Sequence, residues 1–148
     1  MRKLLFGVLF MIGLFFSGFG LYACEMRYSL VQPDGNELDI SPGDPAGTPV
    51  ILHAGESYTL QVVFIQDHRK CVTPAEETVY LVDEEKWKLT KEYLSLQLLS
   101  QSDWREVSTG RWEQEIEFQP LREGECVLEV IRDCPKGGYD ERLVFRVS

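Results

Sequence analysis

Basic residues are scarce in this sequence, and the shortage narrows the possible functions. Lysine and arginine together number 15 among 148 residues, against 24 aspartates and glutamates. Nucleic-acid binding needs basic side chains to neutralise phosphates, and adhesion to an anionic lipid surface needs them as well. We therefore expect no nucleic-acid partner.

Catalytic and cofactor motifs are also missing. The sequence holds no G-x-S-x-G, no H-E-x-x-H, no phosphate-cradling glycine loop and no dinucleotide fingerprint. Three adjacent acids at 83–85 lack the alternating ligand spacing of a calcium loop, so we expect a solvated turn there. We predict neither an enzyme nor a bound cofactor.

The one long apolar run stands at the N-terminus. Two basic residues follow Met1, residues 4–22 carry no charge, and small Ala23 comes next. This is the pattern of an export signal, and we predict a leader over residues 1–23. The run exceeds the usual signal core of ~7–15 residues and approaches the ~20 of a membrane span, so a retained anchor is an alternative. Without the leader the charge is 13 − 24 = −11.

The leader ends in the sequence LYAC, at residues 21–24. It resembles the lipobox of bacterial lipoproteins, with Leu21 three positions before the cysteine and Ala23 directly before it; Tyr22 departs from the small residue of that pattern. The resemblance implies that Cys24 carries a lipid and anchors the protein to a membrane of the cell envelope, either periplasmic or at the outer surface. Ordinary cleavage and a retained anchor remain open.

After the leader, the dominant signal is alternation of apolar and polar residues. Apolar residues occupy every second position in segments 58–64, 94–98, 128–130 and 143–147, and Trp112, Ile116 and Phe118 alternate with glutamates in segment 112–118. This pattern predicts strands with one buried and one wet face. Turn formers separate them, among them "PDGN", "HAGE", "REGE" and "PKGGYD". We predict an all-β fold: residues 24–148 form a single immunoglobulin-like antiparallel β-sandwich of seven to eight strands.

One segment combines helical and strand signals. Residues 73–76, Thr-Pro-Ala-Glu, have the signature of a helix start, with Thr73 as cap and Glu76 reaching back. The residues that follow, 78–82, are β-branched, aromatic or leucine without helical spacing. We predict one helical turn at most, and then a strand.

Four cysteines in a small exported chain suggest disulfide bonding. Cys126 and Cys134 lie at the two ends of one predicted strand, roughly 26 Å apart, and therefore cannot bond each other. In immunoglobulin order, segment 57–67 is strand B and segment 126–133 is strand F, so the B–C and F–G loops bring Cys71 near Cys134. We predict a Cys71–Cys134 disulfide, a buried Cys126 thiol, and Cys24 at the same end as the disulfide. A different strand order would instead allow Cys24 to pair with Cys126.

Candidate binding residues gather in the two loops that this disulfide would join, 67–77 and 133–141. Such stiffened loops on a rigid sandwich often carry binding residues, and we predict His68, Arg69, Lys136 and Tyr139 as contacts. Trp104, in a predicted turn, is a further candidate. It is the preferred member of a possible tryptophan platform that would also include Trp87 and Trp112; Trp112 has core parity and is discounted.

A metal site is the alternative hypothesis for the loop at 67–77. Asp67, His68 and Cys71 in "QDHRKC", with Cys134 nearby, offer thiolate and imidazole ligands for zinc or copper. A metal motif normally shows a second Cys or His pair, whereas this chain has only two histidines. We therefore prefer an exposed histidine beside a structural disulfide, and predict no metal.

The layout of residues 50–147 resembles the immunoglobulin-like domains of bacterial surface and periplasmic proteins. It is also similar in strand order to the chagasin-type inhibitors of cysteine peptidases, but their loop motifs are absent: "QDHRKCVTP" and "IRDCPKGG" stand in their places. The resemblance implies an exported, non-enzymatic binding or assembly module with a protein partner. A cysteine peptidase inhibitor and a metal or redox site at Asp67, His68, Cys71 and Cys134 are the alternatives.

Overall fold

The computed structural model describes residues 24–43, 49–66, 71–135 and 138–148, so the predicted leader lies outside the described residues. None of the described residues forms a helix with the length and apolarity that a membrane crossing requires. The described chain contains eleven strands and one short 3₁₀ helix: β1 (Glu25–Val31), β2 (Glu37–Ile40), β3 (Val50–Leu52), β4 (Tyr58–Ile65), η1 (Ala75–Glu77), β5 (Val79–Val82), β6 (Glu85–Lys86), β7 (Leu96–Gln101), β8 (Arg105–Ser108), β9 (Arg111–Pro120), β10 (Gly124–Arg132) and β11 (Tyr139–Val147).

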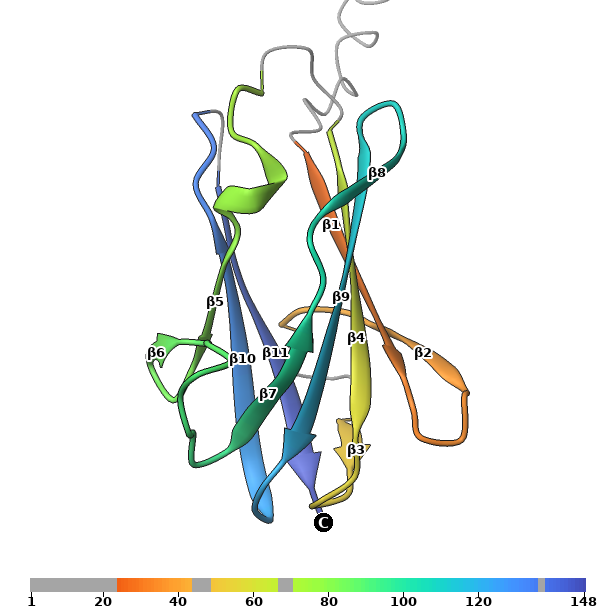
Figure 1. The fold of residues 1–148 in the computed structure, drawn as a ribbon, viewed down its shortest axis with the longest axis vertical. Coiled ribbons are helices and arrows are strands. Elements are labelled where there is room, and N and C mark those ends of the chain that lie inside the picture. Colours follow the sequence, from red (N-terminus) through yellow and green to blue (C-terminus); the bar gives the residue numbers. More distant parts are fainter. Residues whose placement is uncertain (1–23, 44–48, 67–70, 136–137) are drawn as a thin grey trace, which may run out of the picture.

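The strands form two sheets that lie face to face (Figure 1). The first has the order β2-β1-β4-β9-β7, with β8 also paired to β9, and the second has the order β3-β11-β10-β5-β6. Neighbours are antiparallel except for β3 and β11, which are parallel. The all-β prediction is confirmed. Eleven strands exceed the seven to eight expected, and the additional ones include short strands at sheet edges.

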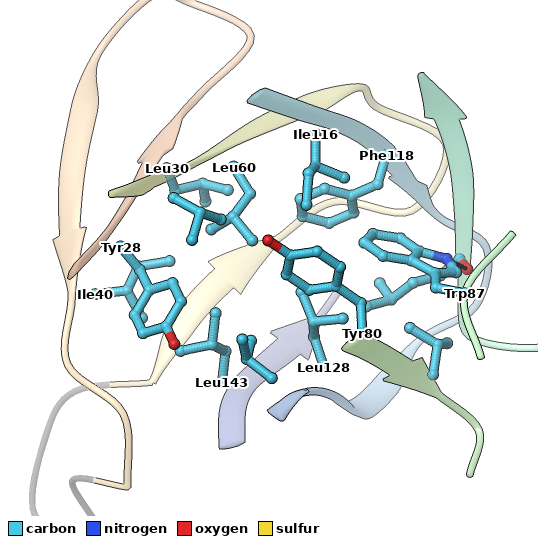
Figure 2. Close-up of a cluster of buried hydrophobic side chains, with 14 of the residues drawn as sticks. Tyr28, Leu30, Ile40, Leu60, Tyr80, Trp87, Ile116, Phe118, Leu128 and Leu143 are labelled. Atoms are coloured by element: carbon cyan, nitrogen blue, oxygen red, sulfur yellow. Dashed lines mark hydrogen bonds between the residues drawn. The ribbon is translucent and has the colours of Figure 1, made fainter. Parts of the chain in front are cut away.

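Alternation along the strands builds the core between the sheets (Figure 2). Every second residue of β4 is buried, beginning with Tyr58 and ending with Phe64. Phe118 of β9 contributes a ring 5.9 Å from that of Phe145 in β11, so aromatic contacts join the two sheets. Each fully buried large apolar side chain contributes ~1.5–3 kcal/mol, and this packing fixes which face of each strand points outward.

The predicted strand at 94–98 begins later than expected. Leu94 is 70% exposed, Ser95 is buried, and β7 starts at Leu96. The cause is Asp83, whose carboxylate accepts hydrogen bonds from the backbone N–H groups of Leu94 and Ser95 and from the Ser95 hydroxyl. Asp83 and Glu84, both at positive φ, form the two-residue turn between β5 and β6. This acidic turn is therefore also a hydrogen-bonded support for the start of β7.

The single helical turn predicted after residue 73 is confirmed, and a strand follows it. Residues Ala75–Glu77 form one 3₁₀ turn, followed by β5. The predicted cap is wrong: Pro74 occupies the N-cap position and no side chain caps the turn. The carbonyl of Thr73 instead accepts a hydrogen bond from Arg132.

The elongated sandwich has two ends that differ in character. At one end, uppermost in Figure 1, Cys24 precedes β1, Cys71 precedes η1 and Cys134 follows β10; we call this the cysteine end. The opposite end holds β3, the turn between β9 and β10, and Cys126 near the start of β10.

Candidate functional site at the cysteine end

Three thiols that are far apart in the sequence meet at the cysteine end. The sulfur atoms of Cys24, Cys71 and Cys134 all lie within 4.8 Å of one another, and those of Cys71 and Cys134 are 3.9 Å apart. Cys24 is buried, with 2% of its surface exposed, while the other two are half-buried. The cluster therefore has one wall inside the protein and one side open to solvent.

Each thiol is positioned by a different part of the fold. Cys24 directly precedes Glu25, the first residue of β1, which is paired with Ile65 of β4. The carbonyl of Cys71 accepts a hydrogen bond of 2.9 Å from the side-chain amide of Gln66. Cys134 follows the end of β10 by two residues. The first sheet, the crossover between the sheets and the second sheet thus each supply one sulfur.

Arg132, the last residue of β10, lies fully buried beneath this cluster. Its guanidinium donates hydrogen bonds to the carbonyl of Thr73 and, at 2.6 Å, to the carbonyl of Pro74. It also lies over the ring of Phe64, 3.9 Å from the ring centre, in a cation–π contact. These contacts fix the segment after Cys71 against the end of β10.

Within the described part of the chain, hydrogen bonds and a ring contact accompany the charge of Arg132, and no ion pair does. No carboxylate of the described residues forms an ion pair with it, and its Nε atom has no hydrogen-bond partner in the same part of the chain. An arginine is always charged, and burying such a charge without compensation is costly. The carbonyls of Thr73 and Pro74 that it binds lie two and three residues after Cys71, so the guanidinium adjoins the segment that carries this thiol.

The surroundings of Cys71 favour its ionised form. Burial raises the pKa of the Cys71 thiol, but hydrogen bonds with Cys24, the Thr73 backbone, Cys134 and Arg132 outweigh burial and leave the pKa below its ordinary value. The pKa of Tyr139, the first residue of β11, is shifted upward instead. Burial, and then the nearby Cys24 and Glu141, raise the pKa of Tyr139 to about 12.

The cysteine predictions can be compared with these positions. The structure brings Cys71 and Cys134 together, at thiol–thiol contact distance rather than at the ~2.05 Å of a disulfide bond, so their bonding stays a prediction. Cys24 lies at the same end as these two. Cys126 lies at the opposite end, where it pairs with Phe145 in the β10–β11 ladder, so it does not meet Cys24.

The predicted contact residues divide into two groups. Asp67, His68, Arg69 and Lys136 lie outside the described residues, and the metal alternative that includes Asp67 and His68 therefore stays a prediction. Tyr139 lies at the cysteine end, half-buried and packed against the core.

The three tryptophans differ in burial, and the role of Trp104 as a contact stays a prediction. Trp87 is buried, and its indole N–H donates a hydrogen bond to the carbonyl of Leu96. Trp104 and Trp112 are half-buried against the core. The neighbours of Trp104, Asp103 and Arg105, line a depression beside the outer face of β9, but the indole itself is engaged in packing.

Sequence reasoning missed two features of this end. The first is the buried Arg132. It lies two positions after Val130 and faces inward like Leu128 and Val130, so the sequence signal was a charged residue at an inward-facing position of the strand. The second is the pair of Tyr28 in β1 and Glu141 in β11, whose side chains hydrogen-bond across the two sheets. Burial raises the pKa of Glu141, although this hydrogen bond opposes the shift. No periodicity predicts that pair, because its members lie 113 residues apart.

No family model matches this chain, and neither the curated proteins nor the solved structures compared with it gave a match.

Proposed function

We propose that this protein is an exported, non-enzymatic binding module of the immunoglobulin-like type that engages its ligand at the cysteine end. Export is inferred from the basic start, the apolar run and the small residue before Cys24. The strand order supports the immunoglobulin-like type: β1, β4, β9 and β7 follow the order A-B-E-D, opposite β5, β10 and β11 as C, F and G.

One observation carries the choice of the cysteine end. Arg132 ties the crossover segment after Cys71 to the end of β10 through the carbonyls of Thr73 and Pro74. Connections between strands are usually the mobile parts of a sandwich, and a preorganised connection binds a ligand with less loss of conformational freedom. Next to this fixed segment, Val72 is 80% exposed, the most exposed of the large apolar residues described. A rigid segment that presents an apolar side chain to solvent supports a contact surface.

Site-specific photo-crosslinking in the cells that produce the protein tests this proposal. A photoreactive amino acid replaces Val72 at the cysteine end or, as the matched control, Leu121 near the opposite end, which is 43% exposed. We expect specific adducts from position 72 and none from position 121, with both variants melting within a few degrees of the parent. Adducts of equal yield from both positions, or from neither, would contradict the proposal.

Tyr139 gives a second, finer readout. Because its ring packs against the core, Tyr139→Ala would disturb the fold, whereas Tyr139→Phe keeps the packing and removes the hydroxyl. We expect Tyr139→Phe to reduce the yield of the position-72 adduct while leaving the melting temperature unchanged. An unchanged adduct yield would remove Tyr139 from the contact surface.

Lipidation of Cys24 remains a prediction, and it competes with the thiol cluster. A lipoprotein anchor would be a thioether on the Cys24 sulfur. That sulfur is buried and lies within 4.8 Å of two others, so the lipid would have to displace its neighbours. The mass of the mature N-terminal peptide distinguishes a lipidated cysteine from an unmodified one.

A further inference from the structure

The geometry of the three sulfurs is that of a metal-ligand set. Metal–sulfur bonds of ~2.3 Å place neighbouring sulfurs about 3.8 Å apart around a tetrahedral ion and about 4.0 Å apart around a trigonal one. The separation between Cys71 and Cys134 is 3.9 Å, and all three sulfurs lie within 4.8 Å of one another. Small rotations of the side chains would bring every pair to ligand spacing.

The cluster also has the support and the access that a metal site requires. Cys24 adjoins the paired start of β1, while Cys71 and Cys134 lie on either side of the contacts that Arg132 makes. Sites supported by rigid elements hold their ligands at the required spacing. Because Cys71 and Cys134 are half-exposed, an ion can reach the sulfurs from solvent.

Arg132 provides an independent observation that points to an anionic occupant. Three thiolates around Zn(II) carry one net negative charge, and around Cu(I) they carry two. A fully buried guanidinium, without an ion-paired carboxylate among the described residues, donates hydrogen bonds to the carbonyls of Thr73 and Pro74, two and three residues after Cys71. It would offset the negative charge of such a complex, as groups beyond the ligands do in protein metal sites.

We propose that Cys24, Cys71 and Cys134 together bind one thiophilic metal ion, Cu(I) or Zn(II), as a tris-thiolate centre. Soft thiolate ligands select these ions over Mg²⁺, Ca²⁺ and Mn²⁺. On binding, each thiol releases its proton to solvent and the sulfur lone pair forms the metal bond. Three sulfurs complete a trigonal Cu(I) site, whereas Zn(II) would add a fourth ligand on the solvent side.

The metal site lies at the same end of the sandwich as the proposed contact surface. It rests on the proposed function only in that both are placed at this end. Crosslinking from position 72 needs no metal, and metal binding by purified protein needs no partner. The two proposals can therefore fail separately.

The test is a metal titration of the full chain, purified in mild detergent under anaerobic, reducing conditions. Cu(I) is presented with a competing copper chelator, and Zn(II) with a competing zinc chelator. Cys24→Ser, Cys71→Ser and Cys134→Ser each remove one ligand, and Cys126→Ser is the matched control because that thiol lies at the opposite end. Circular dichroism checks that each variant is folded, and Cys24→Ala replaces Cys24→Ser if the buried hydroxyl prevents folding.

The two metals are titrated separately. We expect the parent and Cys126→Ser to bind one equivalent of metal in the Cu(I) titration, in the Zn(II) titration, or in both. Each ligand variant should bind at least tenfold more weakly. The proposal is overturned if the parent does not compete with either chelator, or if binding survives the loss of Cys24 unchanged. It is equally overturned if the mature protein carries a lipid on the Cys24 sulfur, or if Cys71 and Cys134 form a disulfide that resists reduction in the folded protein.

Discussion

The two ends of the sandwich place the same side chain in opposite environments. At the cysteine end, burial raises the pKa of the Cys71 thiol, but hydrogen bonds, the strongest of them with Cys24, outweigh burial and lower the pKa. At the opposite end, burial, with a further contribution from Asp83, raises the pKa of the Cys126 thiol to about 12. The sequence presents both simply as cysteines of one chain, yet the fold makes one a candidate ligand and the other an inert apolar residue.

The ends also differ in what holds them together. The opposite end is closed largely by backbone hydrogen bonds, such as that from the N–H of Gly55 to the carbonyl of Pro120 at 2.8 Å and that from Ser148 to Leu52 at 2.9 Å. The cysteine end also has backbone hydrogen bonds, such as that from the N–H of Gln66 to the carbonyl of Gly110 at 2.7 Å. In addition, one buried charged side chain, Arg132, donates hydrogen bonds that cross from β10 to the segment after Cys71. This buried charge distinguishes the cysteine end from the opposite end.

The largest expected effect comes from removing the guanidinium. Arg132→Met should lower the free energy of unfolding by about 3 kcal/mol, because the partly buried carbonyls of Thr73 and Pro74 lose charged donors and Phe64 loses its cation. Urea denaturation measures this loss. Arg142→Met is the control, since Arg142 is exposed and forms a 3.4 Å ion pair with Glu129; it should change the stability by no more than about 0.5 kcal/mol. Similar small losses in both variants would show that Arg132 does not organise the cysteine end.

The second effect is a difference in thiol reactivity. In reduced, metal-free protein at neutral pH, Cys71 should react with iodoacetamide at least about 100-fold faster than Cys126, because the thiolate is the reacting form and Cys126 is also buried. Peptide mass spectrometry over time gives both rates from one sample. Unfolding the protein in urea should bring the two rates close together. A Cys126 that reacts as fast as Cys71 in the folded protein would remove the contrast between the two ends.

The smallest expected effect concerns the acidic turn near the opposite end. Burial raises the pKa of Asp83, but hydrogen bonds from Ser95 and the backbone of Leu94 outweigh it and lower the pKa overall. Asp83 therefore adds stability above its unfolded pKa of about 3.9, and that stability is lost as pH falls through the lower folded value.

Asp83→Asn should accordingly destabilise the protein at pH 7 by less than about 1 kcal/mol, since Asp83 is largely exposed. The difference from the parent should shrink at acidic pH, as measured by thermal unfolding. Metal affinity at the cysteine end should not change. A difference that grows as pH falls would contradict the sign of the shift.

Much of the fold followed from alternation. The segments at 58–64, 112–118, 128–130 and 143–147 lie within β4, β9, β10 and β11, because a half-buried strand needs an apolar residue at every second position. The predicted start of β7 was two residues too early. Leu94 fits the alternation of apolar residues, but its backbone N–H donates a hydrogen bond to Asp83 and lies outside the strand. Short edge strands such as β6 contain too few residues to show a period.

The site was predictable only in part. The predicted immunoglobulin strand order places Cys71, Cys134 and Cys24 at one end, but the approach of all three sulfurs also depends on the path of the segment after Cys71. Arg132 fixes that path by hydrogen bonds to backbone carbonyls. The pattern of side chains in the sequence does not reveal where backbone carbonyls lie. The sequence does show an arginine at an inward-facing position of β10. Its role became clear only from the hydrogen bonds that it donates in the structure.

X-ray absorption spectroscopy of the metal-loaded protein counts the sulfur ligands directly. For the parent and for Cys126→Ser, we expect a first coordination shell with three sulfurs at about 2.3 Å. For Cys24→Ser, we expect the loss of one sulfur. A shell dominated by nitrogen or oxygen, or a shell that is unchanged in Cys24→Ser, would contradict the proposed tris-thiolate centre.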